Sequence, residues 1–249
     1  MAERIEYGDG PMQYGVLHEA AGPARGTVVL IHGGFWRGTP DYFDGPTPLA
    51  HALVAQHWHV WQIEYRQTPN GGGWPTTLDD LAAGVEHLAA AAREHGLDTG
   101  PVVTVGHSAG GHLAVWALSR PEAGLRLTEA VSLAGALDLA LGEAEGMGDG
   151  AVVDFLGGTS EEHPVRYAAA DPTRRIVPGS PVRIVHGDRD DVVPLNQSEA
   201  YADAARRAGQ DVALTVVHGD HKVVIEPQGE AFDALLAALD GVLAAAGRA

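Results

Sequence analysis

Two hydrophobic patterns alternate along the chain. Short runs rich in β-branched and aromatic residues indicate buried strands, and they cover 27–31, 58–65, 102–105, 130–133, 182–186 and 212–217. Between several of them, apolar residues recur every three or four positions, as in amphipathic helices, at 78–89, 196–208 and 229–246. The alternation predicts a mostly parallel sheet with helices on both faces.

One segment breaks this alternation. Residues 136–180 contain glycines, prolines and acidic residues without a clear period. We expect them to form an irregular, cap-like excursion over one end of the sheet and not a second domain. The chain, residues 1–249, is therefore predicted to be a single domain.

Charge and composition exclude several classes of partner. The net charge is −17 and Lys222 is the only lysine, so no basic cluster is available for a nucleic acid. No stretch approaches the ~18 to 20 apolar residues that a membrane span needs. Cysteine is absent, which excludes disulfides and thiolate metal sites, and the N-terminus lacks the apolar run of a signal peptide. We expect a cytoplasmic protein.

The stretch "GHSAG" at 106–110 fits the G-x-S-x-G pattern of a nucleophile elbow. A valine-rich strand precedes it and the helical residues 113–118 follow, which is the context that the motif requires. The glycines allow the strand and the helix to approach more closely than a Cβ would permit. We therefore predict that Ser108 is an exposed nucleophile.

A serine hydroxyl needs a base that is oriented by an acid, in the chain order serine, acid, histidine. Asp188, Asp190 and Asp191 follow the fifth predicted strand, and His218 and His221 follow the last one. Both loops lie at carboxyl ends of parallel strands, where active sites of such sheets form. His221 is the preferred base because it lies within the loop, whereas His218 closes the strand. The three aspartates remain open at this point.

Glycines also follow the first predicted strand, in "HGGFW" at 32–36. Small residues there would let backbone N–H groups approach a substrate carbonyl oxygen. We expect the oxyanion donors to be Gly34 or Phe35 together with Ala109, the residue after the predicted nucleophile. Trp36 and Trp74 follow glycines on nearby loops, and we expect both to line the substrate pocket. No metal or organic cofactor is expected.

Six stretches together resemble the α/β-hydrolase superfamily: "HGGFWR", "EYR", "GGGWPTTLDD", "GHSAGGHLA", "HGDRDDVVP" and "GDHKVVIEP". Within it they look most like the kynurenine formamidase (arylformamidase) and small carboxylesterase branch. The resemblance implies a twisted sheet of about eight strands and a triad of Ser108, Asp190 and His221. Asp190 holds the fifth position of the H-G-x-x-D-x-x-V-P pattern, which selects it over its neighbours.

This resemblance implies a serine hydrolase that cleaves a short-acyl amide or ester, with N-formylkynurenine as the preferred substrate. A general short-chain carboxylesterase or thioesterase is the alternative. A hypothesis outside the enzymes is a non-catalytic small-molecule receptor of the same fold. The chain departs from kynurenine formamidases at Lys222, where an aromatic residue is common. A homodimer is left open.

Overall fold

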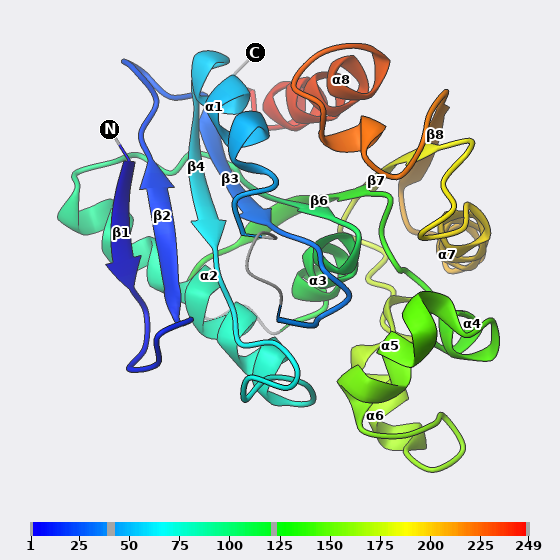
Figure 1. The fold of residues 1–249 in the computed structure, drawn as a ribbon. Helices are drawn as coiled ribbons and strands as arrows, with labels where there is room; N and C mark the ends of the chain where they lie inside the picture. The colour runs from blue at the N-terminus through cyan, green and yellow to red at the C-terminus, as the bar shows by residue number, and fades with distance from the viewer. Residues whose placement is uncertain (1, 39–42, 121–123, 248–249) are drawn as a thin grey trace.

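Eight strands form one twisted sheet in the computed structural model, which describes residues 2–38, 43–120 and 124–247 (Figure 1). The strands are β1 (Ala2–Glu6), β2 (Tyr14–His18), β3 (Gly26–Ile31), β4 (Trp58–Ile63), β5 (Val102–His107), β6 (Leu127–Leu133), β7 (Val182–Gly187) and β8 (Val212–Val217). Their order across the sheet is β1-β2-β4-β3-β5-β6-β7-β8. Strands β3 to β8 are parallel, whereas β2 pairs antiparallel with both β1 and β4. The predicted mostly parallel sheet is confirmed.

The six apolar runs of the sequence correspond to the six parallel strands. All six residues of β3 and of β4 are buried, because helices cover both faces of these strands. The two N-terminal strands were not anticipated. β1 reads AERIE and four of its five residues are exposed, so this edge strand lacks the apolar run that marks the others.

Helices cover the sheet on both faces, as Figure 1 shows. They are α1 (Thr47–Ala55), α2 (Thr76–Glu94), α3 (Ala109–Leu118), α7 (Asn196–Arg207) and α8 (Glu230–Ala245). One apolar layer joins α1 and α8 to the sheet, and α2, α3 and α7 pack on the opposite face. No helix in the described parts of the chain is both long and apolar enough to cross a membrane.

The segment 136–180 is more regular than its sequence indicated. It contains α4 (Leu139–Ala144), α5 (Met147–Leu156), α6 (Pro164–Ala170) and the short 3-10 helix η1 (Pro172–Arg174). Glycines flank α5 on both sides in left-handed conformations, and a proline opens α6. The glycines and prolines thus mark the ends of short helices and not an absence of helix. In Figure 1 these helices lie together at one end of the sheet.

A buried carboxyl group at the other end of the sheet makes stability depend on pH. Glu129 in β6 is 4% exposed, its Oε1 has no hydrogen bond within the described chain, and its Oε2 lies 3.6 Å from Arg183 Nη2. Burial raises the pKa of Glu129 to about 7 despite the neighbouring arginine. The folded chain therefore holds a proton that the unfolded chain releases, and stability falls as the pH rises from about 4.5 to about 7.

Glu129→Gln should remove this loss. We expect the free energy of unfolding at pH 8 to rise by about 1 to 3 kcal/mol, and the difference from the parent to shrink to near zero at pH 4.5. Urea denaturation at both pH values measures it, and Glu161→Gln, at an exposed glutamate, serves as the control. An equal change at both pH values would show that the ionisation of Glu129 is not the cause.

Candidate active site

Ser108 occupies the sharp turn between β5 and α3. Its backbone has φ 57° and ψ −122°, a strained combination for a residue with a side chain. The Ser108 N–H donates to Leu133 O at 2.9 Å, which ties the turn to the neighbouring strand β6. Ser108 lies at the carboxyl edge of the sheet and lines a cleft, but it is only 3% exposed and not openly exposed as predicted.

The two glycines of the motif are required by close backbone contacts. A Cβ at Gly106 would overlap the carbonyl oxygen of Gly110, and a Cβ at Gly110 would overlap the carbonyl oxygen of Ile31. Helix α3 therefore lies directly against β5 and β3, closer than any residue with a side chain would allow.

Asp190 and His221 lie together although 31 residues separate them, because the loops after β7 and β8 meet at the same edge of the sheet. The His221 Nδ1–H donates to Asp190 Oδ2 at 2.7 Å, and both side chains are almost fully buried. The other carboxylate oxygen, Oδ1, accepts from the Val192 and Val193 N–H groups, each at 2.9 Å. The imidazole is thus held through Nδ1, and no described residue forms a hydrogen bond with its Nε2.

A second histidine holds the same carboxylate. His186, at the end of β7, lies with Nε2 2.9 Å from Val193 O and 3.2 Å from Asp190 Oδ2, and its Nδ1 is 2.7 Å from Ser198 Oγ. Since the Val193 oxygen can only accept, Nε2 carries the proton and also donates to Asp190. Burial alone would raise the pKa of Asp190, but the hydrogen bonds from His186 and His221 outweigh it and hold that pKa far below the ordinary value. Asp190 is therefore ionised.

The competing residues form a second pair that differs in its surroundings. His218 Nδ1 donates to Asp188 Oδ2 at 3.0 Å, but the two side chains are 69% and 42% exposed. The Arg189 guanidinium donates to His218 Nε2 at 2.7 Å, so this nitrogen cannot accept a proton from a serine. Asp191 is exposed. Of the two candidate bases, only His221 lines the cleft that contains Ser108, and Asp190 lies buried behind it.

His107, directly before the nucleophile, supports the histidine loop. Its Nε2–H donates to His221 O at 2.9 Å, and the two rings pack with their centroids 4.5 Å apart. Burial, together with charge repulsion from His221, lowers the pKa of His107 to about 3. A neutral ring therefore fixes the backbone of His221 and adds no competing charge.

The glycine-rich loop after β3 adopts left-handed backbone conformations at three successive residues. The φ angles are 112° at Gly34, 52° at Phe35 and 55° at Trp36. Ala109 begins α3, where the first N–H groups of a helix have no intrahelical acceptor. The three predicted oxyanion donors thus lie on two segments that flank Ser108.

A network of buried polar groups holds the glycine-rich loop after β3 in place. His32 Nδ1 lies 2.8 Å from Gly33 O and its Nε2 lies 2.9 Å from Glu64 Oε1. The Tyr65 hydroxyl donates to His32 O at 2.8 Å, and its ring stacks on the imidazole at 4.4 Å. His32 therefore contacts the loop backbone through Nδ1 and the buried Glu64 side chain through Nε2, and these contacts hold the loop in place.

A cleft of about 460 Å³ opens above these groups. It is lined by Gly33, Gly34, Phe35, Gly45, Pro46, His107, Ser108, Val192, His221, Lys222 and Ile225. Most of its surface is apolar, and the polar side chains converge at the serine and the histidines. Such a cleft suits a small, mainly apolar molecule with one reactive polar bond.

The predicted pocket role of Trp36 is wrong. Trp36 is completely buried, donates from Nε1 to His112 Nδ1 at 3.1 Å and stacks on Phe155 at 4.7 Å. The left-handed turn directs its ring under the loop and away from the cleft. Trp74 is half-buried, packs against the core and is not among the residues that line the cleft. Pro46 and Ile225 line the cleft instead, and no pattern in the sequence singled them out.

The loop is also joined to α5. Arg37 donates from Nη1 to Gly148 O at 2.8 Å and from Nη2 to Asp149 O at 3.0 Å, and its guanidinium also pairs with Asp154 at 2.7 Å. Gly148, Asp149 and Gly150 are all left-handed, and a Cβ at Gly148 would lie 2.6 Å from the Phe35 ring. The turn in α5 therefore packs closely against one wall of the cleft.

Comparisons with known proteins give a family and a fold. The family model described as BD-FAE matches residues 17–204. The chain is 29% identical over 223 residues to esterase LipC of Mycobacterium tuberculosis, which covers 82% of this chain and 54% of that protein. It is 28% identical over 220 residues to esterase LipQ of the same organism, covering 80% of this chain and 49% of that protein. The chain thus spans about half the length of these curated relatives.

Solved structures show the same architecture. A truncated carbohydrate esterase from gut microbiota superposes with a TM-score of 0.80 at 17% identity, covering 97% of this chain and 95% of that one. Esterase 2 of Thermogutta terrifontis with bound propionate gives 0.78 at 22% identity, covering 99% and 95%. The predicted α/β-hydrolase fold is confirmed.

Proposed function

The chain belongs to the BD-FAE family, and we propose that it is a carboxylesterase that hydrolyses short-acyl esters through an acyl-enzyme. The relatives described above are esterases, and none of them is described as a formamidase. The carboxylesterase alternative of the sequence analysis therefore replaces arylformamidase as the leading function.

One observation carries this proposal. The buried hydrogen bond of 2.7 Å between His221 Nδ1 and Asp190 Oδ2 holds an imidazole in the same cleft as a strained serine. A fixed tautomer with Nε2 unprotonated is what a general base for Ser108 needs. The lowered pKa of Asp190 keeps a negative charge beside the ring, and this charge stabilises the imidazolium that forms during the reaction.

The reaction then follows from these positions. His221 takes the proton of Ser108 as its oxygen attacks the ester carbonyl carbon, and the resulting tetrahedral intermediate collapses as His221 returns the proton to the leaving alkoxide. Water attacks the acyl-enzyme in the second half, with His221 again as base. The N–H groups of Ala109 and of Gly34 or Phe35 are the proposed donors to the oxyanion, each worth about 3 to 4 kcal/mol in the transition state.

Phe35 is proposed to limit the acyl group. It follows the oxyanion glycines directly, lines the cleft and is backed by the tight turn at Gly148. We expect kcat/KM for octanoyl aryl esters to be more than tenfold lower than for acetyl or butyryl aryl esters. Each methylene that does not fit the pocket costs about 1 to 3 kcal/mol. Measuring the series from acetyl to octanoyl, together with N-formylkynurenine, checks this expectation.

Phe35→Ala keeps the backbone donor and should move the preference toward longer acyl chains. A steady rise toward octanoyl in the parent protein would contradict the proposed short-acyl pocket. Faster cleavage of N-formylkynurenine than of every ester would restore the formamidase interpretation.

A further inference from the structure

A single lysine lies at the mouth of the cleft. Lys222 is the only lysine in the chain, its side chain is exposed, and it lines the cleft together with Ser108 and His221. No carboxylate of the described residues lies within 4.0 Å of its ammonium group, and none of the described residues that line the cleft is acidic. The cleft therefore offers one positive charge that the described protein does not neutralise.

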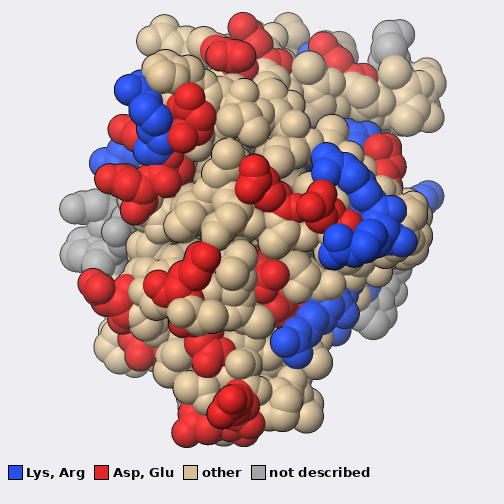
Figure 2. All heavy atoms as spheres, turned by 90° about the vertical axis from the view of Figure 1, so that its right-hand side faces the viewer, with Lys and Arg blue, Asp and Glu red and all other residues tan. Residues whose placement is uncertain are grey.

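The surroundings make this charge unusual. The chain carries a net charge of −17, and Figure 2 shows acidic side chains spread over the face that carries α7 and β8, with several groups of basic side chains between them. Several arginines form ion pairs with acidic side chains, among them Arg37, Arg66 and Arg183. An unpaired cation within an acidic surface creates a local site for an anion.

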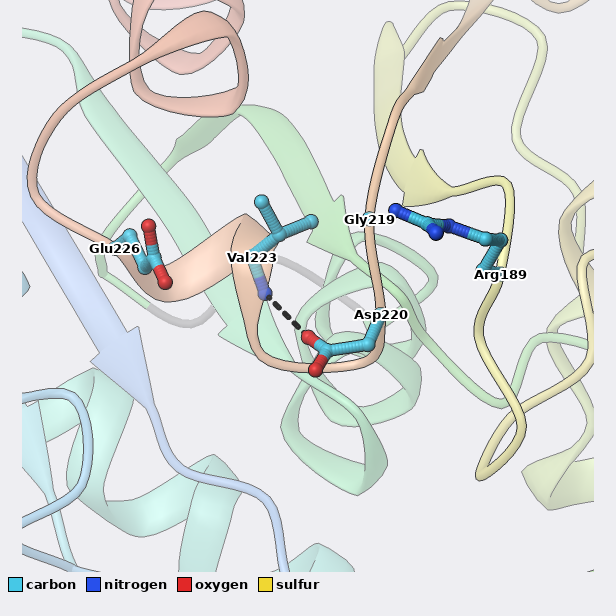
Figure 3. Close-up of a pocket in the computed structure, with 5 residues that line it drawn as sticks. All are labelled: Arg189, Gly219, Asp220, Val223 and Glu226. Carbon is cyan, nitrogen blue, oxygen red and sulfur yellow. Dashed lines mark hydrogen bonds between the residues drawn. The ribbon is translucent and has the colours of Figure 1, made fainter.

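Hydrogen bonds within the loop fix the backbone at Lys222. The Asp220 carboxylate accepts from the Lys222 N–H at 2.9 Å and from the Val223 N–H at 3.2 Å, so Asp220 is engaged with the backbone. Figure 3 shows this carboxylate in a second hollow, which Arg189 and Glu226 also line. That hollow contains two acids and one cation, whereas the cleft contains only the lysine among described charged side chains.

The position of Lys222 selects one half of the ester. His221 must reach the leaving oxygen to return the proton, so the leaving group lies beside the histidine loop. Lys222 follows His221 directly in the chain and also lines the cleft, so we assign it to the leaving-group half of the ester and assign Phe35, beside the proposed oxyanion donors, to the acyl half.

We propose that Lys222 binds a carboxylate on the leaving group, so that the enzyme prefers esters whose alcohol or phenol part is acidic. This inference rests on the proposed esterase function. It adds a substrate class: a short acyl group on a hydroxylated carboxylic acid.

The test compares two acetyl esters that differ in charge alone, 4-acetoxybenzoate and 4-acetoxybenzamide. The readout is the ratio of kcat/KM for the acid to kcat/KM for the amide, which cancels general effects on the serine. We expect Lys222→Met to lower this ratio about three- to fivefold. Lys222→Arg should retain it within about twofold, and Arg189→Met, in the outer hollow, should leave it unchanged.

Salt gives an independent measurement. In the parent protein the ratio should fall as NaCl rises from 20 to 500 mM, because exposed charges are screened, and it should not fall in Lys222→Met. A ratio that is the same in the parent and in Lys222→Met at low salt would overturn the inference while leaving the esterase proposal intact. No turnover of either ester by the parent would instead count against the proposed function itself.

Discussion

Replacing Ser108 with alanine should lower kcat for acetyl esters by about 10⁴-fold or more. The strained turn presents one hydroxyl to the cleft. Without it the variant has no nucleophile and cannot form the acyl-enzyme, so only direct attack by water would remain. The remaining activity would come from binding and from the oxyanion donors. Ester hydrolysis measured with the purified variant, whose fold is checked by circular dichroism, gives the value.

Covalent labelling adds a second readout. A fluorophosphonate probe should modify Ser108 and no other serine, as found by peptide mapping. Ser132→Ala is the matched control, because Ser132 is buried and its hydroxyl has no hydrogen-bond partner in the described chain. Label at another serine would contradict the assignment of the nucleophile. Tight ligand binding without turnover by the parent would favour the receptor reading.

Substitutions in the Asp190–His221 pair should also have a large effect on kcat, and the exposed Asp188–His218 pair serves as the control. His221→Ala should cost about 10⁴-fold in kcat and Asp190→Asn about 10³- to 10⁴-fold, since the base and its tautomer are both lost. His218→Ala and Asp188→Asn remove the same kind of hydrogen bond from the exposed pair. They should change kcat by no more than about threefold.

Coupling between the residues sharpens this comparison. Once Ser108 is alanine, the further change His221→Ala should cost little, because residues that act as one unit are not additive. If His218→Ala is the inactive variant, or if the two losses multiply, the proposed triad is wrong.

Much of the fold and of the candidate site could be predicted from short stretches of sequence. The six parallel strands are apolar runs, and the elbow at Ser108 needs only its two glycines between a strand and a helix. The loops that carry Asp190 and His221 follow from the position of the strands that precede them. Selecting Asp190 among three aspartates needed a family pattern, because nothing in the spacing distinguishes a buried carboxylate from its exposed neighbours.

Other parts depend on contacts between distant segments. Trp36 is in the core because the backbone is left-handed from Gly34 through Trp36, and the residue types there do not predict that turn. His186 holds Asp190, and Glu64 holds His32, through hydrogen bonds that exist only after the strands have assembled. The strand β1 is polar because it is an edge, so its sequence resembles a loop.

The contact between Arg37 and the turn in α5 has a consequence for how such a protein can diversify. Two of its bonds go to the carbonyl oxygens of Gly148 and Asp149, which every amino acid possesses. Mutations that alter the side chains of α4 to α6 can therefore accumulate without breaking this attachment, provided that Gly148 stays small beside Phe35. Gene duplicates of this chain would be free to drift in the helices that border the cleft while inheriting an unchanged reactive centre.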